Sequence, residues 1–239
     1  MAEWFSTAFG PEYLQLYAHR GEDESRAQLD GVIRAAELEA GQSILDLACG
    51  TGRYARPLAG LGYRVTGMDY SGTLLAEAKK RGPELNWVRG DMRRPPFGPA
   101  RFDRVLSLFT SFGYFEDDAV NAAVLRGMAG LLKPGGRLYL DYLNPATVRE
   151  SSWQTEGLGE LRLSTRKHIE AETRMVVKDV RVHCGGALKT EYCERVKLYD
   201  STWFSRQTAV AGLRLRRVAG GHDGIPFVEQ SPRAVYLFE

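Results

Sequence analysis

A seven-residue stretch, Asp46-Leu-Ala-Cys-Gly-Thr-Gly52, combines a carboxylate with two closely spaced glycines. It closes an apolar run that begins at Ser43, and a helical pattern follows it. Glycines in such a turn let backbone amides approach a bound group without a Cβ in the way, and the N-terminus of the next helix adds positive potential. The stretch therefore predicts a small-ligand site at the end of a strand.

Asp46 indicates the charge of that ligand. Gly50, Gly52 and Ala55 also fit the GxGxxG/A spacing of a dinucleotide site, with Asp69 near the place of a ribose-binding acid. A pyrophosphate gains nothing from a carboxylate four residues before the first glycine, because like charges repel. Asp46 thus favours a ligand that carries positive charge, while its alternative role is that of an acid capping a turn or a helix.

The elements that must position these residues alternate between strand and helix. The patterns predict strands over 43–48, 64–69, 85–88, 102–109 and 137–141, and helices over 53–61, 71–81 and 117–132. Ser71 is the expected N-cap of the second helix, and Lys133-Pro-Gly-Gly136 is expected to end the third and turn the chain into the fifth strand. This order predicts a doubly wound α/β fold whose parallel sheet is covered on both faces.

At ILDLACGTGRYA, residues 44–55, the chain resembles the class I S-adenosylmethionine-dependent methyltransferases, and in overall pattern it is closest to small-molecule N-methyltransferases with a β insertion. The resemblance covers roughly Gly41 to Asn144. It implies a mostly parallel seven-stranded sheet and S-adenosylmethionine as the cofactor, whose ammonium and sulfonium groups suit Asp46. Ligands of such open sheets bind at the carboxyl ends of the strands, where the strand order switches.

The resemblance assigns parts of the cofactor to particular residues. It implies that Gly50 and Gly52 line the methionine part, that Asp46 helps hold the amino group, and that Asp69 takes the two ribose hydroxyls. Asp91 and Met92 match the motif that meets the adenine, and the purine ring is expected between Tyr70 and Met92. Turn acids and a surface tyrosine are the alternative roles. The predicted cofactor-binding set is Asp46, Ala48, Gly50, Gly52, Asp69, Tyr70, Asp91, Met92, Leu108 and Tyr17.

The segment before the first strand, residues 1–40, is predicted to form a helical cap with a break at Gly21. In the methyltransferases that the chain resembles, an N-terminal helix with tyrosines and a basic residue folds across the site. Tyr13, Tyr17, His19 and Arg20 occupy the comparable stretch. The alternative is an amphipathic helix whose tyrosines pack on the sheet.

Residues 109–115 form an unusually aromatic loop after the fourth strand, at the end of the sheet where a methyl acceptor is expected. The Asn/Asp-Pro-Pro-aromatic motif of enzymes that methylate DNA amines or protein glutamine is absent. The loop resembles that of sugar and amine N-methyltransferases, and Tyr114 is the best candidate beside the acceptor. Packing against the next helix is its alternative role. The predicted substrate set is Thr110, Ser111, Phe112, Tyr114 and Asn144, and the catalytic candidates are Tyr114, His19 and His222.

The rest of the chain is predicted to divide into a β insertion and the end of the core. Alternating polar and apolar residues predict antiparallel strands within 147–200, with a hairpin turn at Cys184-Gly-Gly-Ala187. This insertion is expected to cover the cavity or to form an oligomer interface. The core then comprises 41–146 and 201–239, in which 201–212 leaves room for a short helix before strands over 213–218 and 234–238. His222 lies in the loop between these strands.

Composition excludes several other classes of protein. The chain has 239 residues and a formal net charge of +2, which gives no support to a nucleic-acid partner based on overall charge. No apolar run approaches the roughly 18 residues of a membrane span, and the first ten residues do not resemble a signal peptide, so a cytoplasmic protein is expected. The three cysteines have no spacing typical of a metal site, and no metal is expected.

These observations predict an enzyme that transfers a methyl group from S-adenosylmethionine to a nitrogen or oxygen of a small molecule by in-line displacement. Two alternatives stay open at this point. One is a methyltransferase that acts on RNA or protein, which would need an extended basic face and would bind in a salt-dependent manner. The other is a protein that binds S-adenosylmethionine without catalysis.

Overall fold

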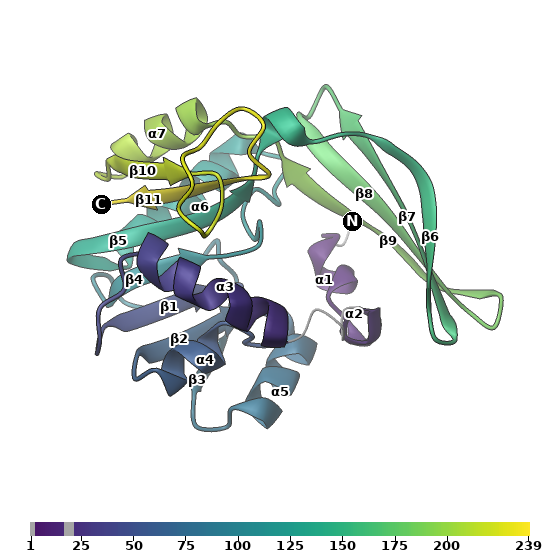
Figure 1. Cartoon of the computed structure of the whole chain (residues 1–239), viewed down its shortest axis with the longest axis horizontal. Helices are drawn as coiled ribbons and strands as arrows, with labels where there is room; N and C mark the ends of the chain where they lie inside the picture. Colours follow the sequence, from purple (N-terminus) through teal and green to yellow (C-terminus); the bar gives the residue numbers. More distant parts are fainter. Residues whose placement is uncertain (1–2, 17–21) are drawn as a thin grey trace.

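The chain folds into a large sheet flanked by helices and a second, smaller sheet to one side of it (Figure 1). The structure is a computed structural model that describes residues 3–16 and 22–239. Tyr17, His19 and Arg20 therefore lie outside the described residues, and their predicted roles stay predictions. Within the described ranges, no helix is both long and apolar enough to cross a bilayer.

The large sheet has seven strands in the order β10-β11-β5-β4-β1-β2-β3. All of its pairings are parallel except those of β11, which runs antiparallel to β5 and to β10. The order switches between β1 and β4, so the loops that follow these two strands diverge and leave a crevice. The predicted doubly wound, mostly parallel seven-stranded fold is confirmed. The strands are β1 (Ser43–Leu47), β2 (Arg64–Asp69), β3 (Asn86–Arg89), β4 (Phe102–Ser107), β5 (Leu132–Leu143), β10 (Leu215–Ala219) and β11 (Arg233–Phe238).

Helices cover both faces of this sheet because successive strand residues point to opposite sides. Ile44, Leu106 and Tyr139 pack on one face with apolar residues of α3 (Glu22–Ala35) and α4 (Ala55–Gly60). Leu45 and Val105 pack on the other face with α6 (Asp118–Gly130) and α7 (Ser201–Val210). The helix α5 (Gly72–Arg81) packs on β2 and β3, and the Ser71 hydroxyl caps it as predicted by accepting the Leu74 amide.

Two elements of the core differ from the predicted ones. The Lys133-Pro-Gly-Gly136 segment is part of β5, where a register shift against β4 and a positive φ of 76° at Gly135 absorb the turn. The helix α7 is ten residues long, as long as α5, so this part of the chain holds a regular helix and the expected shortening is wrong. Asp200 begins α7 directly after the insertion by accepting the Trp203 amide at 2.8 Å, which leaves enough residues for a full helix.

The small sheet lies between β5 and α7 in the sequence and consists of four antiparallel strands. They are β6 (Ser151–Leu158), β7 (Leu161–Glu170), β8 (Met175–Cys184) and β9 (Ala187–Lys197), and a short 3-10 turn, η1 (Pro145–Thr147), precedes them. The predicted hairpin turn joins β8 to β9 through Gly185 and Gly186, both with positive φ. The sequence patterns missed β6. The predicted domain limits at 40, 146 and 200 stay a proposal.

Two short N-terminal helices, α1 (Phe5–Ala8) and α2 (Pro11–Leu16), lie between the large sheet and the small one (Figure 1). The first packs against β9, and Phe5 belongs to the same apolar cluster as Leu45 and Met68 of the large sheet. The N-terminal segment therefore bridges the core and the insertion, and it closes the space between them on one side.

Candidate active site

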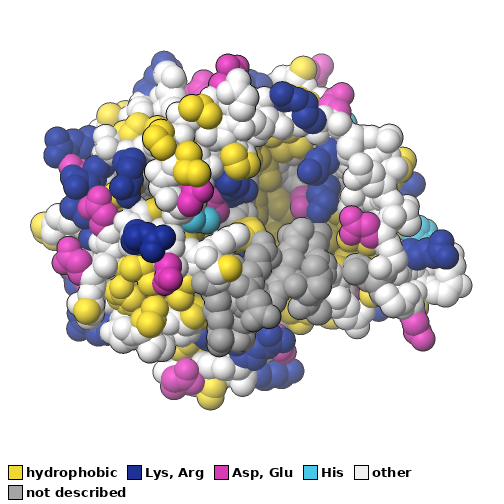
Figure 2. Space-filling model, in the orientation of Figure 1, with side chains coloured by type: hydrophobic (Ala, Val, Ile, Leu, Met, Phe, Trp, Pro, Cys, Tyr) yellow, Lys and Arg dark blue, Asp and Glu magenta, His cyan; other side chains and the backbone are white. Residues whose placement is uncertain are grey.

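A cavity of about 590 Å³ lies at the carboxyl ends of β1 to β4, where the large sheet faces the insertion. Figure 2 shows this face hollowed between the two parts, with hydrophobic side chains at depth and charged ones at the rim. Most of the predicted site residues within the described ranges line it. They are Asp46, Ala48, Gly50, Asp69, Tyr70, Asp91, Met92, Leu108, Thr110, Ser111 and Tyr114.

The glycine turn after β1 forms part of the cavity wall, and its two glycines have different roles. Gly50 lines the cavity with φ of 57°, and its amide donates to Asp69 Oδ2 at 2.8 Å. Gly52 is not among the residues that line the cavity, and its contact with the cofactor stays a prediction. A Cβ on Gly52 would lie 2.3 Å from the Trp87 ring, and its φ is 74°. Glycine is needed at position 52 because the turn passes so close to β3.

Two carboxylates from neighbouring strands lie buried in the wall of the cavity. Asp69 accepts the amides of Gly50 and Ser71, both at 2.8 Å, and burial raises its pKa despite these bonds. The backbone amide of Ala55, at the start of α4, lowers the pKa of Asp46 only slightly. Burial first, and repulsion from Asp69 second, raise the pKa of Asp46 to about 7 even though Arg53 opposes the shift. A cationic ligand would relieve this repulsion.

The predicted adenine residues lie at the ends of β2 and β3. Tyr70 is 39% exposed and packs edge-on against Phe5, with ring centroids 5.4 Å apart. The Asp91 carboxylate is held by the Arg93 side chain, with Nε to Oδ2 at 2.9 Å, and Arg93 also binds Glu3. Burial alone would raise the pKa of Asp91, but the hydrogen bonds from Arg93 outweigh it and lower the pKa. Arg93 therefore links the Asp91 carboxylate to Glu3 of the N-terminal segment and holds it in place.

The aromatic loop after β4 begins with two strained residues. Phe109 and Thr110 both have positive φ, 57° and 61°, which non-glycine residues rarely adopt. Ser111 stabilises the turn by donating to the Leu108 carbonyl at 2.7 Å. Phe112 is 1% exposed and packs on Tyr142 and other aromatic rings of the core, so its predicted contact with a substrate is wrong. The loop thus places Thr110, Ser111 and Tyr114 in the cavity wall and Phe112 in the core.

Tyr114 lies in the cavity wall against aromatic side chains of the N-terminal segment. Its ring centroid is 4.8 Å from that of Trp4 and 6.3 Å from that of Phe9, and the Trp4 indole donates to its carbonyl. The sequence patterns missed Trp4 and Phe5 as cavity residues, although aromatic residues at 4, 5, 9 and 13 fit a helical spacing. Burial raises the pKa of Tyr114 well above its usual range, so this phenol stays neutral and is no base near neutral pH.

Two predicted residues have structural roles outside the cavity. Asn144 donates to the carbonyls of Glu229 and Ser231, both at 2.8 Å, and thereby anchors the loop before β11. His222 Nδ1 lies 2.7 Å from the Tyr139 hydroxyl, and its Nε2 lies 3.4 Å from Asp141 Oδ2. The predictions of Asn144 as a substrate residue and of His222 as a catalytic residue are therefore wrong, since other side chains and the backbone occupy their polar atoms.

Comparison with known proteins agrees with this geometry. Residues 44–136 match a family described as a methyltransferase domain, and the chain has the class I methyltransferase fold. The match spans β1 to the start of β5, which is the part that builds the glycine turn and the cavity wall.

The methyltransferase is also similar over most of its length to characterised proteins and solved structures. It is 28% identical to a cypemycin N-terminal methyltransferase of Streptomyces, over 83% of each chain. It is 29% identical to the dTDP-3-amino-3,6-dideoxy-alpha-D-glucopyranose N,N-dimethyltransferase of Streptomyces fradiae, over 89% of this chain and 86% of the relative. The structure of the CcbJ methyltransferase from Streptomyces caelestis superimposes with a TM-score of 0.78 at 24% identity, over 88% and 89% of the two chains.

The prediction of S-adenosylmethionine as the cofactor agrees with the methyltransferase domain match and with solved structures of similar fold that contain this molecule. The residues in the cavity fit this molecule on an independent observation. Asp46 and Asp69 are 3% and 7% exposed and both pKa values are raised, so a positively charged group of the ligand would be stabilised beside them. When bound, the cofactor supplies a methyl group already activated by its sulfonium.

A buried network braces the strained turn of the methyltransferase from behind. Asp141 on β5 is 2% exposed and accepts the Phe109 amide at 2.8 Å and Arg233 Nε at 2.7 Å. Arg233 Nη2 in turn donates to Thr110 Oγ1 at 2.9 Å. Burial alone would raise the pKa of Asp141, but His222 and Arg233 outweigh it and lower the pKa. The carboxylate stays ionised and holds the turn in its strained form.

The variant Asp141→Asn is expected to destabilise the protein by about 2 kcal/mol, because it removes the buried charge that binds the Phe109 amide and the partly exposed Arg233 side chain. The difference from the wild type should shrink as the pH falls, since a lowered pKa contributes stability only where the carboxylate is ionised. Urea unfolding at pH 7 and at about pH 2, below the ordinary carboxyl pKa of 3.8, measures both effects.

The control for this variant is Asp103→Asn. Asp103 is paired with Lys133 at 2.9 Å at the opposite end of the sheet, so this variant should lose stability without a change in acceptor KM. Asp141→Asn should also raise that KM, because the turn is no longer fixed. Equal kinetic behaviour of the two variants would contradict the bracing role.

Proposed function

We propose that the protein transfers a methyl group from S-adenosylmethionine to an amine nitrogen of a small molecule. The observation that carries this proposal is the cavity itself, which is enclosed by the core, the N-terminal helices and the insertion, and has aromatic side chains opposite two buried carboxylates. A cavity of about 590 Å³ is of the size that accepts small ligands. Of the two relatives described above, one is named as an N-terminal methyltransferase of cypemycin and the other as an N,N-dimethyltransferase of a dTDP-linked amino sugar.

We assign the cofactor-binding roles as follows. Asp69 accepts the ribose hydroxyls, and Asp46 holds the amino group together with the amide-rich turn at Gly50. Tyr70 and Met92 contact the adenine ring, and Asp91 is fixed at its edge. The support for each role is the same, namely that the residue lines the cavity at the carboxyl end of its own strand.

The protein side of the reaction consists mainly of positioning. Trp4, Phe9 and Tyr114 exclude water and hold the acceptor against the loop after β4. Because the phenol of Tyr114 stays neutral, it orients the acceptor as a hydrogen-bond donor or acceptor and takes no proton. The amine must therefore lose its proton before the nitrogen lone pair is available.

The charges of the insertion support a small acceptor over RNA or an acidic protein. Its basic side chains are largely paired with acidic ones on neighbouring strands, and Figure 2 shows both signs of charge on this part of the surface. Such paired charges bind phosphate backbones weakly. The pairs are Arg166 with Asp179, Lys178 with Glu194, Arg181 with Glu191, and Arg195 with Glu170.

The decisive experiment is an acceptor screen with methyl-labelled S-adenosylmethionine. The panel contains amino sugars, amino-sugar nucleotides, alkyl and aryl amines and short peptides, each beside its hydroxyl counterpart, together with total tRNA and a protein extract. We expect label to enter one or more of the amines. Transfer confined to alcohols or phenols would contradict the choice of nitrogen, and transfer confined to tRNA or protein would contradict a small acceptor.

A further inference from the structure

The insertion contributes an acidic side chain to the cavity that the cofactor-binding roles do not use. Glu194 of β9 lines the cavity together with Val196 of the same strand. The buried carboxylates Asp46 and Asp69 belong to the other side of the cavity, at the ends of β1 and β2. Glu194 is thus an anionic group on the insertion side of the cavity, facing the loop that carries the predicted acceptor residues.

The surroundings of Glu194 are those of an acceptor subsite. The Glu194 carboxylate and Tyr13 both contribute to raising the pKa of Tyr114, and all three side chains line the cavity. The helix α1, which carries the aromatic wall, packs on the same strand as Glu194. An acceptor that lies against Tyr114 would therefore place its polar end near the Glu194 carboxylate.

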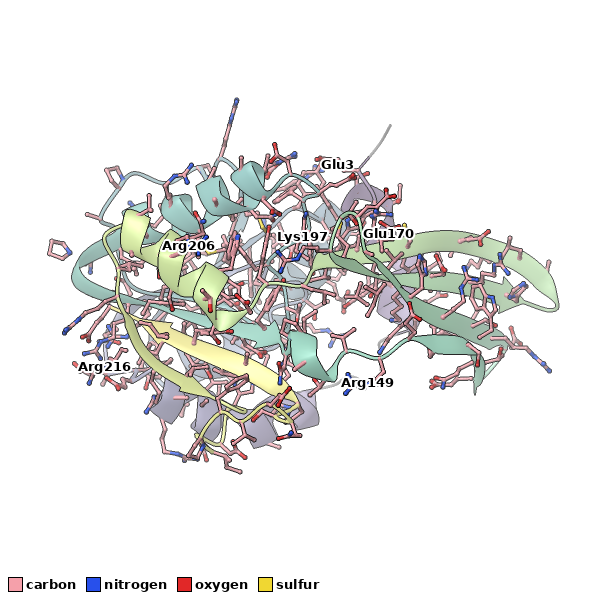
Figure 3. All side chains as sticks on the ribbon, turned by 90° about the horizontal axis from the view of Figure 1, so that it is seen from above. Glu3, Arg149, Glu170, Lys197, Arg206 and Arg216 are labelled. Carbon is pink, nitrogen blue, oxygen red and sulfur yellow. The ribbon has the colours of Figure 1, made fainter. Side chains whose placement is uncertain are left out.

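The position of Glu194 is fixed by the residues that follow it on β9. The Lys197 amide donates to the Gly113 carbonyl at 2.8 Å, and Lys197 Nζ binds the Thr173 carbonyl and Asp118. The Arg195 side chain forms two hydrogen bonds with Glu170 at the end of β7, across the intervening β8. Figure 3 shows Lys197 where the insertion meets the core and Glu170 close to it on the insertion. This end of β9 is thereby attached to the acceptor loop, which keeps Glu194 at a set place in the cavity wall.

The existing partner of Glu194 leaves room for a second cation. Lys178 Nζ lies 3.5 Å from Glu194 Oε2, which is longer than the 2.7–2.9 Å of a charge-assisted hydrogen bond. The Glu194 side chain is 24% exposed. A ligand ammonium that approaches from the cavity can therefore bind the same carboxylate at hydrogen-bonding distance, in a partly enclosed site where such a bond is stronger than in water.

We propose that Glu194 binds the ammonium group of the acceptor amine and so selects cationic acceptors over neutral ones of the same shape. This inference rests on the proposed N-methyltransferase function and names the residue that recognises the substrate class. The ammonium is the form in which an aliphatic amine arrives at neutral pH, and Glu194 holds it beside Tyr114 until a proton is lost to water. Glu194 acts on binding and specificity.

The test compares the wild type with Glu194→Gln and Glu194→Asp, each saturated with S-adenosylhomocysteine. The probes are benzylamine, which is protonated at pH 7, and benzyl alcohol, which is its neutral counterpart. We expect the wild type to bind benzylamine at least about tenfold more tightly than benzyl alcohol, as for a hydrogen bond to a charged group. Glu194→Gln should remove this preference, and Glu194→Asp should keep part of it. Affinity for S-adenosylhomocysteine should stay unchanged in both variants.

The matched control is Glu191→Gln on the same strand, because Glu191 pairs with Arg181 outside the cavity and is 47% exposed. It should behave as the wild type. No preference for benzylamine in the wild type, or an unchanged preference in Glu194→Gln, would overturn the inference. These binding measurements need no turnover. If the Glu194 inference is wrong, the binding preference is absent although an amine is still methylated in the acceptor screen. If the proposed function is wrong, no amine is labelled in that screen.

Discussion

Replacing Asp69 with alanine is expected to weaken S-adenosylmethionine binding by about 100-fold or more. The substitution removes a carboxylate proposed to accept two ribose hydroxyls, and each hydrogen bond to a charged group contributes roughly 1.5–3 kcal/mol. It also frees the Gly50 and Ser71 amides, which Asp69 accepts at 2.8 Å, so the glycine turn loses its connection to β2. Isothermal calorimetry with S-adenosylmethionine and with S-adenosylhomocysteine measures the loss.

A control variant and a control ligand accompany this measurement. Asp117→Ala removes an acid that caps α6 away from the cavity, by accepting the Ala119 amide, and it should leave cofactor affinity unchanged. Calorimetry with NAD tests the other nucleotide for which the glycine spacing was considered. Wild-type affinity in Asp69→Ala would contradict the ribose assignment, and tight NAD binding without binding of S-adenosylmethionine would contradict the cofactor itself.

The affinity for S-adenosylmethionine is expected to fall about tenfold between pH 8 and pH 6, because Asp46 has a pKa of about 7 in the unliganded protein. The proposed contact with the cofactor ammonium requires the carboxylate. Protonation of Asp46 below pH 7 therefore competes with binding, whereas the site is fully ionised at pH 8. The variant Asp46→Asn should bind weakly at both values and show no such dependence. Calorimetry at pH 6, 7 and 8 measures it, and equal slopes in both proteins would contradict the role of Asp46.

The substitution Asp46→Asn is expected to stabilise the unliganded protein at alkaline pH. A folded pKa of about 7 exceeds the ordinary value of 3.8, so between pH 4 and pH 7 the folded state holds a proton that the unfolded state lacks. The free energy of unfolding of the wild type therefore falls as the pH rises through this window. Asp46→Asn removes that loss, and its advantage over the wild type should be about 2–4 kcal/mol larger at pH 8 than at pH 4. Urea unfolding without cofactor measures the difference, and an advantage that does not change with pH would contradict it.

The carboxylate of Asp46 is thus expected to strengthen cofactor binding and to lower the stability of the unliganded protein. Asp46 and Asp69 lie buried within one cavity, where each raises the energy of the other in the absence of a cation. A cationic ligand that binds only the folded state removes this repulsion and stabilises the folded protein. Saturating S-adenosylmethionine should therefore raise the melting temperature of the wild type more at pH 8 than at pH 6.

Much of the core could be predicted because its signals are local. Apolar runs, glycine turns and helix caps depend on neighbouring residues, and the predicted strands from Ser43 to Phe109 lie within a few residues of the observed ones. The register shift at Lys133-Pro-Gly-Gly136 could not be predicted in this way. A proline and two glycines usually end an element, and only the pairing of β5 with β4 keeps these residues within the strand.

The site residues also divide into those predicted from local sequence patterns and those placed by tertiary contacts. Asp46, Gly50 and Asp69 by themselves determined a cavity at the end of a parallel sheet and a cationic ligand, because their spacing after successive strands fixes where their backbones meet. Only the tertiary structure decided that Gly52 lies against the Trp87 ring and Phe112 in the core, that His222 and Asn144 have structural partners, and that Trp4 and Glu194 line the cavity. These residues are distant in sequence and come together through the packing of α1 and β9 on the core, which no local pattern encodes.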